Sequence, residues 1–267
     1  MKQQLPFEFI YQVGALVIAV ILIHLVYVTA IRPNAEAILE VQAAQAAAGQ
    51  EVIQERSLYV VLQNYEQESC LILMFWAIAI MGYKGRNGLR ERSLLSQDII
   101  TVSEGMSVLP EDTRQYTRAI QALPAEAQDY LLPRALTAAL QRFASTRNIQ
   151  DVSEAVRAVC ENEQDRLDSE LSMVRYIAWA IPSIGFIGTV RGISDALAQA
   201  HRAVEGDITG VTQSLGVAFN STFVALAISI VVMFFVHQLQ LAQERVVLDT
   251  ESYCDRYLIH RLNRTQG

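Results

Sequence analysis

Long apolar segments constrain the fold of this chain more than any other feature of its sequence. Residues 211–237 carry no ionisable side chain before the histidine that ends them, and residues 9–31 are interrupted by only three polar side chains. Each is as long as the roughly 20 residues that a helix needs to cross a bilayer. A third segment covers residues 176–200 and is apolar up to Val190, and a shorter apolar segment covers residues 70–83. Backbone groups in lipid must be satisfied within helices or closed barrels, and no strand-like alternation of useful length occurs. The sequence therefore predicts an all-α polytopic membrane protein.

The number of spans depends on residues 70–83, because a segment of about 14 residues is short for a crossing helix. If it crosses, the chain has four transmembrane helices; if it lies in the interface, the chain has three. Four basic residues lie within residues 84–92, which is typical of a cytoplasmic loop, whereas residues 32–69 hold only two. Four spans then place both termini in the cytoplasm, and three would leave the amino terminus outside.

The amino-terminal segment has one alternative interpretation. Val28-Thr-Ala30 resembles a signal-peptidase site that follows an apolar run. That run is longer than the roughly 7–15 residues usual for a signal peptide. We therefore predict an uncleaved membrane anchor.

Composition and motifs argue against several classes of protein. The net charge is −7, so no basic surface indicates a nucleic-acid partner. The sequence has no Walker loop, metal-ligand cluster or nucleophile motif, so we expect neither an enzyme nor a cofactor. The three cysteines are widely spaced and are interpreted as structural thiols.

The polar segments are predicted to be helical. Residues 35–48 are rich in alanine, with Gly49 as the expected break. Residues 85–172 form the largest polar block, and no helix breaker occurs from Asp151 to Pro182. One long helix should therefore begin in the cytoplasm and enter the membrane as the third span.

The third span carries a face of small residues. Gly185, Gly188, Thr189 and Gly192 recur at helical spacing, so they share one side of the helix. Glycines at this spacing let another backbone approach closely, which is how helices associate in lipid. Pro182, one turn earlier, removes a backbone donor and favours a bend. This face predicts tight packing around one hydroxyl group.

The last span repeats the pattern with a stripe of small and hydroxyl residues at steps of three and four. On one interpretation these residues only permit packing, and each hydroxyl bonds to the carbonyl four residues earlier. Two such stripes on successive spans, each with a mid-span threonine, instead favour ion passage. The stripe comprises Ser214, Ala218, Ser221 with Thr222, Ala225 and Ser229.

Both stripes resemble those of a known family. Gly185-Phe-Ile-Gly-Thr-Val-Arg-Gly-Ile193 is similar to the glycine-threonine motif of the MotA/TolQ/ExbB ion-channel family, and the stretch from Ala218 to Ser229 resembles the last helix of TolQ and ExbB. The likeness covers residues 174–240. TolQ and ExbB carry a glutamate where this chain has Val217, and Asn220 is the nearest polar substitute. The four-span layout resembles MotA, but residues 85–170 lack its recognisable rotor-contacting charges. A stator for a system other than the flagellum fits best.

The resemblance implies an architecture and a mechanism. Five copies would surround two helices of a single-span partner of the MotB, TolR or ExbD kind in the bacterial inner membrane, with the last two spans of each copy lining a pore. An aspartate of the partner would carry a proton or a sodium ion. Thr189 and Thr222 would lie beside it, with Ser221 and Asn220 completing the ion pathway. The rival hypothesis is a non-conducting scaffold assembled through its small-residue faces.

Two further features involve charge. Arg191 and Asp195 are four residues apart near the external end of the third span, so they could pair at the pore mouth or fix the depth of the helix. His24 is explained by a hydrogen-bonded packing role, with a proton relay as the alternative.

The predicted organisation has four parts. Residues 1–84 hold the first two spans and an external helical linker, and residues 85–172 form a cytoplasmic helical region. Residues 173–240 form the pore-lining pair. Residues 241–267 continue the last span as a cytoplasmic helix whose stripe of Val246, Tyr253 and Tyr257 packs on other cytoplasmic helices.

Overall fold

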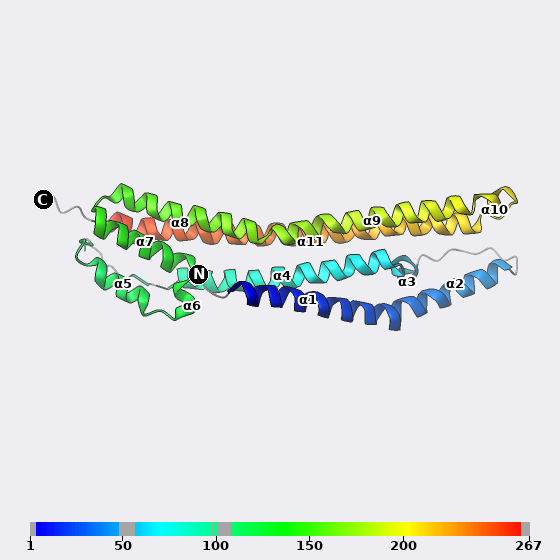
Figure 1. The fold of residues 1–267 in the computed structure, drawn as a ribbon, viewed down its shortest axis with the longest axis horizontal. Coiled ribbons are helices and arrows are strands. Elements are labelled where there is room, and N and C mark those ends of the chain that lie inside the picture. The colour runs from blue at the N-terminus through cyan, green and yellow to red at the C-terminus, as the bar shows by residue number, and fades with distance from the viewer. Residues whose placement is uncertain (1–3, 48–56, 98, 101–107, 263–267) are drawn as a thin grey trace. The chain divides into compact units, whose positions relative to one another are not determined.

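The computed structural model describes residues 4–47, 57–97, 99–100 and 108–262 (Figure 1). Throughout these ranges the regular structure is helical and contains no strand, so the all-α prediction is confirmed. Four helices are long and apolar enough to cross a membrane. The expected break at Gly49 lies outside the described residues.

The first candidate span, Glu8–Gln42, runs through three consecutive elements. Helix α1 (Gln4–Val26) leads into the π-helical turn η1 (Tyr27–Ile31) and then into α2 (Arg32–Ala47). The short helix α3 (Leu58–Leu62) precedes the second candidate span.

The other three spans are longer than their apolar segments. Helix α4 (Tyr65–Leu95) extends the short apolar segment of residues 70–83 at both ends. Helices α8 (Ile149–Glu170) and α9 (Ser172–Ala198) are separated only by Leu171, so the expected long third helix forms with one interruption. The short α10 (Ala200–Val204) leads to α11 (Thr209–Tyr257), the longest helix.

The chain divides into two compact units. Unit 1 comprises Met1–Met81 and Met173–Val236, and unit 2 comprises Gly82–Ser172 and His237–Gly267. Unit 1 therefore holds the apolar segments, and unit 2 holds the largest polar block with the end of α11.

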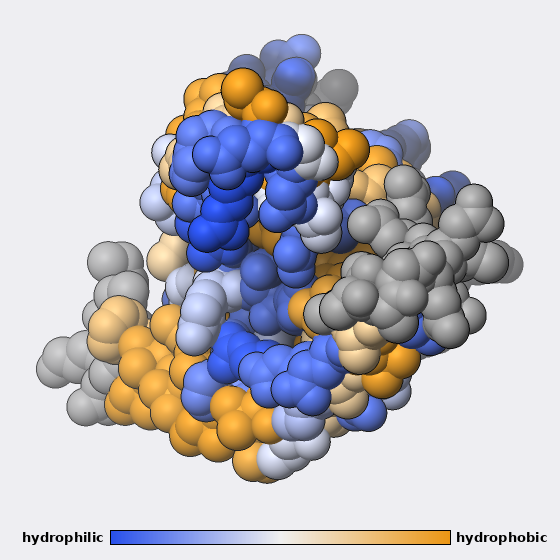
Figure 2. Space-filling model, turned by 90° about the vertical axis from the view of Figure 1, so that its right-hand side faces the viewer, coloured by the Kyte–Doolittle hydropathy of each residue, from blue (hydrophilic) through white to orange (hydrophobic). Residues whose placement is uncertain are grey.

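The outer surface of unit 1 is strongly apolar. Large side chains of α1, α9 and α11 are exposed, including Phe9 at 67%, Trp179 at 70% and Ile230 at 71%. In Figure 2, which views the end of the molecule where α10 lies, hydrophobic residues cover the lower outer surface and hydrophilic residues gather inward of it. Such an outer surface requires lipid or neighbouring helices, as expected of a multi-pass membrane protein.

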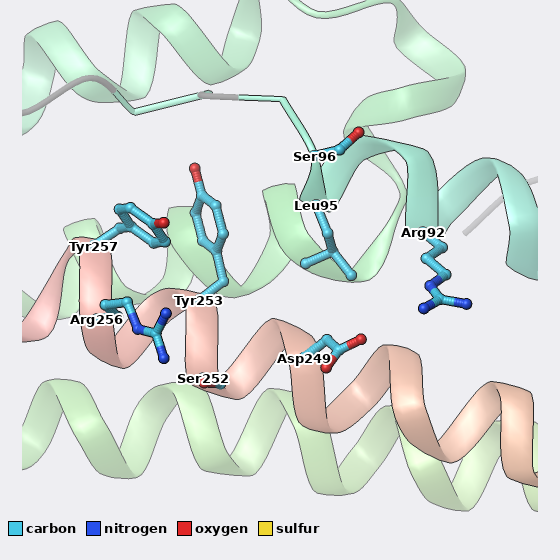
Figure 3. A pocket seen from close by; sticks show the side chains of 8 residues that line it. All are labelled: Arg92, Leu95, Ser96, Asp249, Ser252, Tyr253, Arg256 and Tyr257. Carbon is cyan, nitrogen blue, oxygen red and sulfur yellow. The ribbon is translucent and has the colours of Figure 1, made fainter.

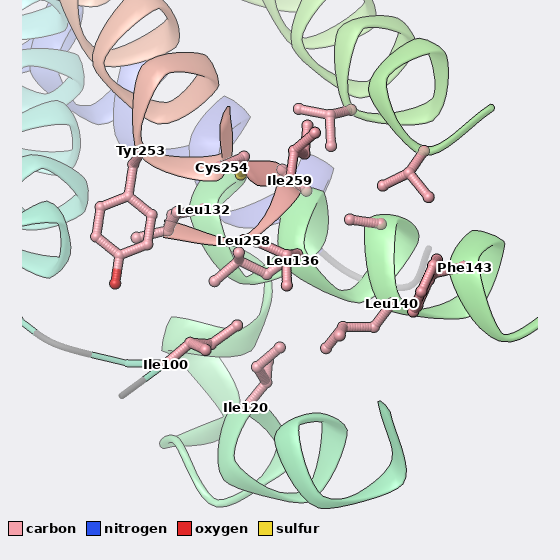
Figure 4. Close-up of a cluster of buried hydrophobic side chains, with 14 of the residues drawn as sticks. Ile100, Ile120, Leu132, Leu136, Leu140, Phe143, Tyr253, Cys254, Leu258 and Ile259 are labelled. Carbon is pink, nitrogen blue, oxygen red and sulfur yellow. The ribbon is translucent and has the colours of Figure 1, made fainter. Parts of the chain in front are cut away.

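Unit 2 has its own hydrophobic core. Helices α5 (Thr113–Gln121), α6 (Ala125–Gln128) and α7 (Leu131–Thr146) lie between α4 and α8 in the chain, and η2 (Ile259–Arg261) follows α11. Apolar residues at helical spacing on α7 pack against α8 and against the end of α11 (Figure 4). This core includes Leu132, Leu136, Leu140, Phe143, Val156, Cys160, Cys254 and Leu258.

The end of α11 packs within unit 2. Val246 and Tyr253 are buried, and the rings of Tyr253 and Tyr257 lie 4.7 Å apart. The expected helical continuation of the last span is therefore present. A cavity of about 420 Å³ lies between this part of α11 and the end of α4 (Figure 3). Its lining comprises Arg92, Leu95, Ser96, Asp249, Ser252, Tyr253, Arg256 and Tyr257.

Candidate functional site

The two stripes of small residues meet face to face in unit 1. Gly185, Gly188 and Gly192 of α9 are buried. A Cβ atom at Gly185 would lie 2.5 Å from the Ala225 Cβ, and one at Gly192 would lie 2.8 Å from the Ala218 backbone nitrogen. Such distances are shorter than real carbon contacts, so only glycine permits this approach of α9 to α11.

The two threonines meet at this crossing. The Thr189 and Thr222 hydroxyl groups contact each other directly. Thr189 Oγ1 also lies 3.2 Å from the Ala218 carbonyl oxygen, and Thr222 Oγ1 donates to the Gly185 carbonyl oxygen at 3.2 Å. We call the Thr189 and Thr222 hydroxyl oxygens, with the Gly185 and Ala218 carbonyl oxygens, the oxygen cluster.

The oxygen cluster has more acceptors than donors. Each hydroxyl supplies one proton and two lone pairs, and each carbonyl supplies only lone pairs. Both threonines are half-buried, so the cluster is not sealed inside the chain. An uncharged group of four oxygens can accept hydrogen bonds from a protonated ligand, or contact a cation, without a fixed charge that would trap it.

Pro182 affects the hydrogen bonding between α9 and α11 at a second place along the two helices. Proline has no backbone N–H, so the Ala178 carbonyl four residues earlier lacks its usual helical donor. Ser229 of α11 donates to that carbonyl at 3.2 Å. A hydroxyl on the neighbouring helix thus replaces the missing backbone bond, as is common where proline lies in a membrane helix.

Three other residues predicted to line the ion pathway or to pack the helices lie outside the oxygen cluster. Ser221 is buried and faces α4, where its hydroxyl accepts from Gln67 Nε2 at 3.3 Å, so it does not join the oxygen cluster. Asn220 is half-buried. Ser214 accepts from Gln199 Nε2 at 3.0 Å and belongs to the packing face.

The expected pairing of Arg191 with Asp195 is corrected by the structure. Arg191 Nη2 lies 2.9 Å from Glu66 Oε2, on the first turn of α4. No ion pair joins Arg191 to Asp195 in the part of the chain that the structure describes. The reason is geometric: a Cβ at Gly188 would lie 3.1 Å from the Glu66 Cγ, so the glycine face lets α4 bring a carboxylate to α9.

Three functional candidates at the start of α4 were missed by sequence reasoning. Glu66 binds Arg191, and Gln67 binds Ser221. Glu68 Oε1 lies 2.7 Å from His24 Nδ1, and its Oε2 lies 2.5 Å from Arg32 Nη2. We call Glu66, Gln67 and Glu68 the polar head of α4.

The sequence did contain a signal for the polar head. Consecutive helical residues project about 100° apart, so three adjacent polar side chains at the start of an apolar helix must face three directions. In a helical bundle they therefore contact different neighbours. The hydrogen-bonded role expected for His24 is supported by its contact with Glu68.

The Glu66–Arg191 pair leads to a stability prediction. Glu66→Gln is expected to lower the free energy of unfolding by about 1–3 kcal/mol, because it leaves a half-exposed guanidinium without its counter-charge. Asp195→Asn, the control, should change it by less than about 0.5 kcal/mol. Thermal unfolding in detergent measures both, and equal shifts would contradict the pairing.

Comparison with known proteins gives one match. Residues 127–252 match the sequence model of the MotA/TolQ/ExbB proton channel family. The matched range includes α9 and α11 as far as Ser252, and it extends beyond the resemblance of residues 174–240 on both sides. No curated protein and no solved structure matches the chain significantly.

Proposed function

The chain belongs, through residues 127–252, to the MotA/TolQ/ExbB proton channel family, and from this membership we propose that it is the ion-conducting stator subunit of a membrane motor. It uses a proton or sodium gradient to drive rotation or force transfer. Proteins of this family are channel and motor subunits that form complexes with a partner protein. The observation that carries the proposal is the oxygen cluster at the glycine-lined crossing of α9 and α11.

The proposed ion carrier is a transmembrane aspartate of a single-span partner. A charged carboxylate is costly in a low-dielectric pore. The hydroxyl groups of Thr189 and Thr222 donate to it when it is ionised, and their lone pairs accept from it when it is protonated. The oxygen cluster thus accommodates both states, which is what repeated loading and release of an ion requires.

The proposed assembly is a pentamer around a dimer of that partner. The exposed apolar faces of α9 and α11 support it, because Val190, Phe219 and Phe223 are each about 70% exposed in the single chain and need lipid or protein neighbours. Native mass spectrometry of gently extracted protein checks the stoichiometry. A monomer would contradict the proposal.

We place the protein in the bacterial inner membrane with both termini in the cytoplasm. The basic residues within 84–92 support this orientation. Labelling of single cysteines near each terminus in intact cells tests it.

Ion flux tests the proposed function. With the partner co-expressed, Thr189→Val plus Thr222→Val is expected to reduce flux at least about tenfold, as removal of positioned proton-transfer groups does. Valine keeps the shape of threonine, so the helix contact should persist. Thr29→Val, which removes a hydroxyl that donates to the Leu25 carbonyl of its own helical segment, is the control. Separate proton and sodium gradients identify the ion.

The scaffold hypothesis has one observation in its favour. The hydroxyl groups of Thr189 and Thr222 bond to backbone carbonyls across the interface, which also holds the helices together. Wild-type protein without flux, or a double variant with unchanged flux, would favour the scaffold over the channel.

A further inference from the structure

The polar head of α4 is buried inside an otherwise apolar unit. Glu66 is 9% exposed, Gln67 is 1% exposed and Glu68 is 5% exposed. Polar groups lose their hydration when they are buried, so they are stable only where partners replace the lost water. The hydrogen-bond partners of these three residues therefore show whether the site is complete.

The hydrogen bonding of the Gln67 side chain is incomplete. Its Nε2 donates to Ser221 Oγ, and Ser221 Oγ donates to the Val217 carbonyl oxygen at 2.9 Å. Gln67 Oε1 is fully buried and has no hydrogen-bond partner among the described residues. Turning the amide over would only replace the orphaned oxygen with an orphaned NH₂ group.

Two more orphaned polar atoms lie near the polar head. Tyr27 Oη and Asn64 Nδ2 are buried without a partner in the described part of the chain. The ring of Tyr27 is 5.7 Å from the Arg32 guanidinium, which binds Glu68. Asn64 directly precedes α4, and its carbonyl accepts from the Glu68 backbone N–H at 3.2 Å.

Buried groups of this kind are usually bridged by ordered water. We propose that the polar head of α4 is a water-binding site, in which water bound at Gln67 Oε1 also contacts Ser221 Oγ and the Glu66 carboxylate. A Cβ at Gly188 would lie 2.8 Å from Ser221 Oγ and 3.1 Å from the Glu66 Cγ, so both side chains pack against this glycine and lie close to each other.

The charges at this site favour water over a bare cation. Glu66 is the only carboxylate among the proposed water ligands, and Arg191 lies 2.9 Å from it. The guanidinium offsets the negative charge that would otherwise attract a metal ion. Neutral acceptors beside a compensated ion pair suit a neutral water molecule.

The proposed water site lies at the same level of α9 and α11 as the oxygen cluster. Ser221 precedes Thr222 on α11, and Gly188 precedes Thr189 on α9. If the proposed channel function holds, on which this step rests, the water hydrates the ion or relays the proton as it reaches the oxygen cluster. Gln67 is then a positioning residue of the pathway.

The first test does not depend on conduction. A structure of the full chain in lipid nanodiscs, at a resolution that reveals bound water, should show an ordered water molecule within hydrogen-bond distance of Gln67 Oε1. A dry site would overturn the inference whether or not the protein conducts.

The second test compares two buried glutamines in the complex with the partner. Gln67→Leu removes the polar atoms at similar volume and should reduce flux at least about tenfold, because the water that relays the proton loses the residue that positions it. Gln243→Leu is the control, because Gln243 is also buried and its Oε1 has no partner within the described ranges, but it belongs to unit 2. The flux of this variant should equal that of the wild type.

The outcomes separate this inference from the proposed function. If the wild type conducts and the assembled Gln67→Leu variant conducts equally, the inference fails and the channel stands. If the wild type does not conduct, the channel proposal fails and the bound water alone decides the inference.

Discussion

Gly192→Leu is expected to separate α9 from α11 and to destabilise the folded protein by about 3 kcal/mol or more. A Cβ at this position would lie 2.8 Å from both the Ala218 backbone nitrogen and the Ser214 carbonyl oxygen. Backbone atoms cannot rotate aside as side chains do, so the whole of α11 must move. Thermal unfolding of detergent-solubilised protein, with the yield of assembled protein, measures the effect.

Gly14→Leu is the matched control for this prediction. Gly14 also lies within a candidate membrane helix, and a Cβ there would meet nothing within 4 Å. The added side chain joins an apolar surface and should leave the unfolding temperature close to that of the wild type. If both leucine variants unfold at the same temperature, the close approach of α9 and α11 is not what stabilises the unit.

Glu163→Ala is expected to lower the free energy of unfolding of unit 2 by about 2–3 kcal/mol. Glu163 is 1% exposed, and its two oxygens bind Arg134 Nη1 at 2.8 Å and Arg166 Nη2 at 2.5 Å. Removing the carboxylate leaves two cations near each other without their shared counter-charge. Their own exposure, 40% and 52%, keeps the loss below that of a fully buried pair.

An exposed carboxylate on the same helix, α8, provides the control for the Glu163 prediction. Glu161 pairs with Arg157 at 2.8 Å, but the two side chains are 65% and 72% exposed. Exposed pairs contribute little because water and salt screen them, so Glu161→Ala should cost no more than about 0.5 kcal/mol. A Glu161 effect as large as the Glu163 effect would show that burial is not the deciding factor.

The sequence predicted those features that depend on helical periodicity and on the lipid environment. Lipid requires helices, so the all-α fold with four long apolar helices followed from the apolar segments. The glycine face of α9 and the small-residue stripe of α11 followed from the 3.6-residue period. The period did not say which helix would cover either face, and the structure shows that the two faces cover each other.

The contacts of α4 could not be derived in the same way. Arg191 had a suitable partner four residues away, and local spacing favoured Asp195. The structure instead pairs it with Glu66, 125 residues earlier in the chain. Such a pair depends on which helices adjoin one another, and a single sequence does not specify the neighbours of α4. The same holds for Gln67 and Ser221, which are 154 residues apart.

The bond from Ser229 to the Ala178 carbonyl also affects how the helix pair can move. In an ordinary helix, curvature is set by bonds within that helix alone. At Pro182 one of those bonds is replaced by a contact from α11, so the hydrogen bonding of α9 at this level depends on the position of its neighbour. A displacement of α11 along α9 would break this contact and leave the Ala178 carbonyl without a donor. Ser229 therefore couples the position of α11 to the hydrogen bonding within α9.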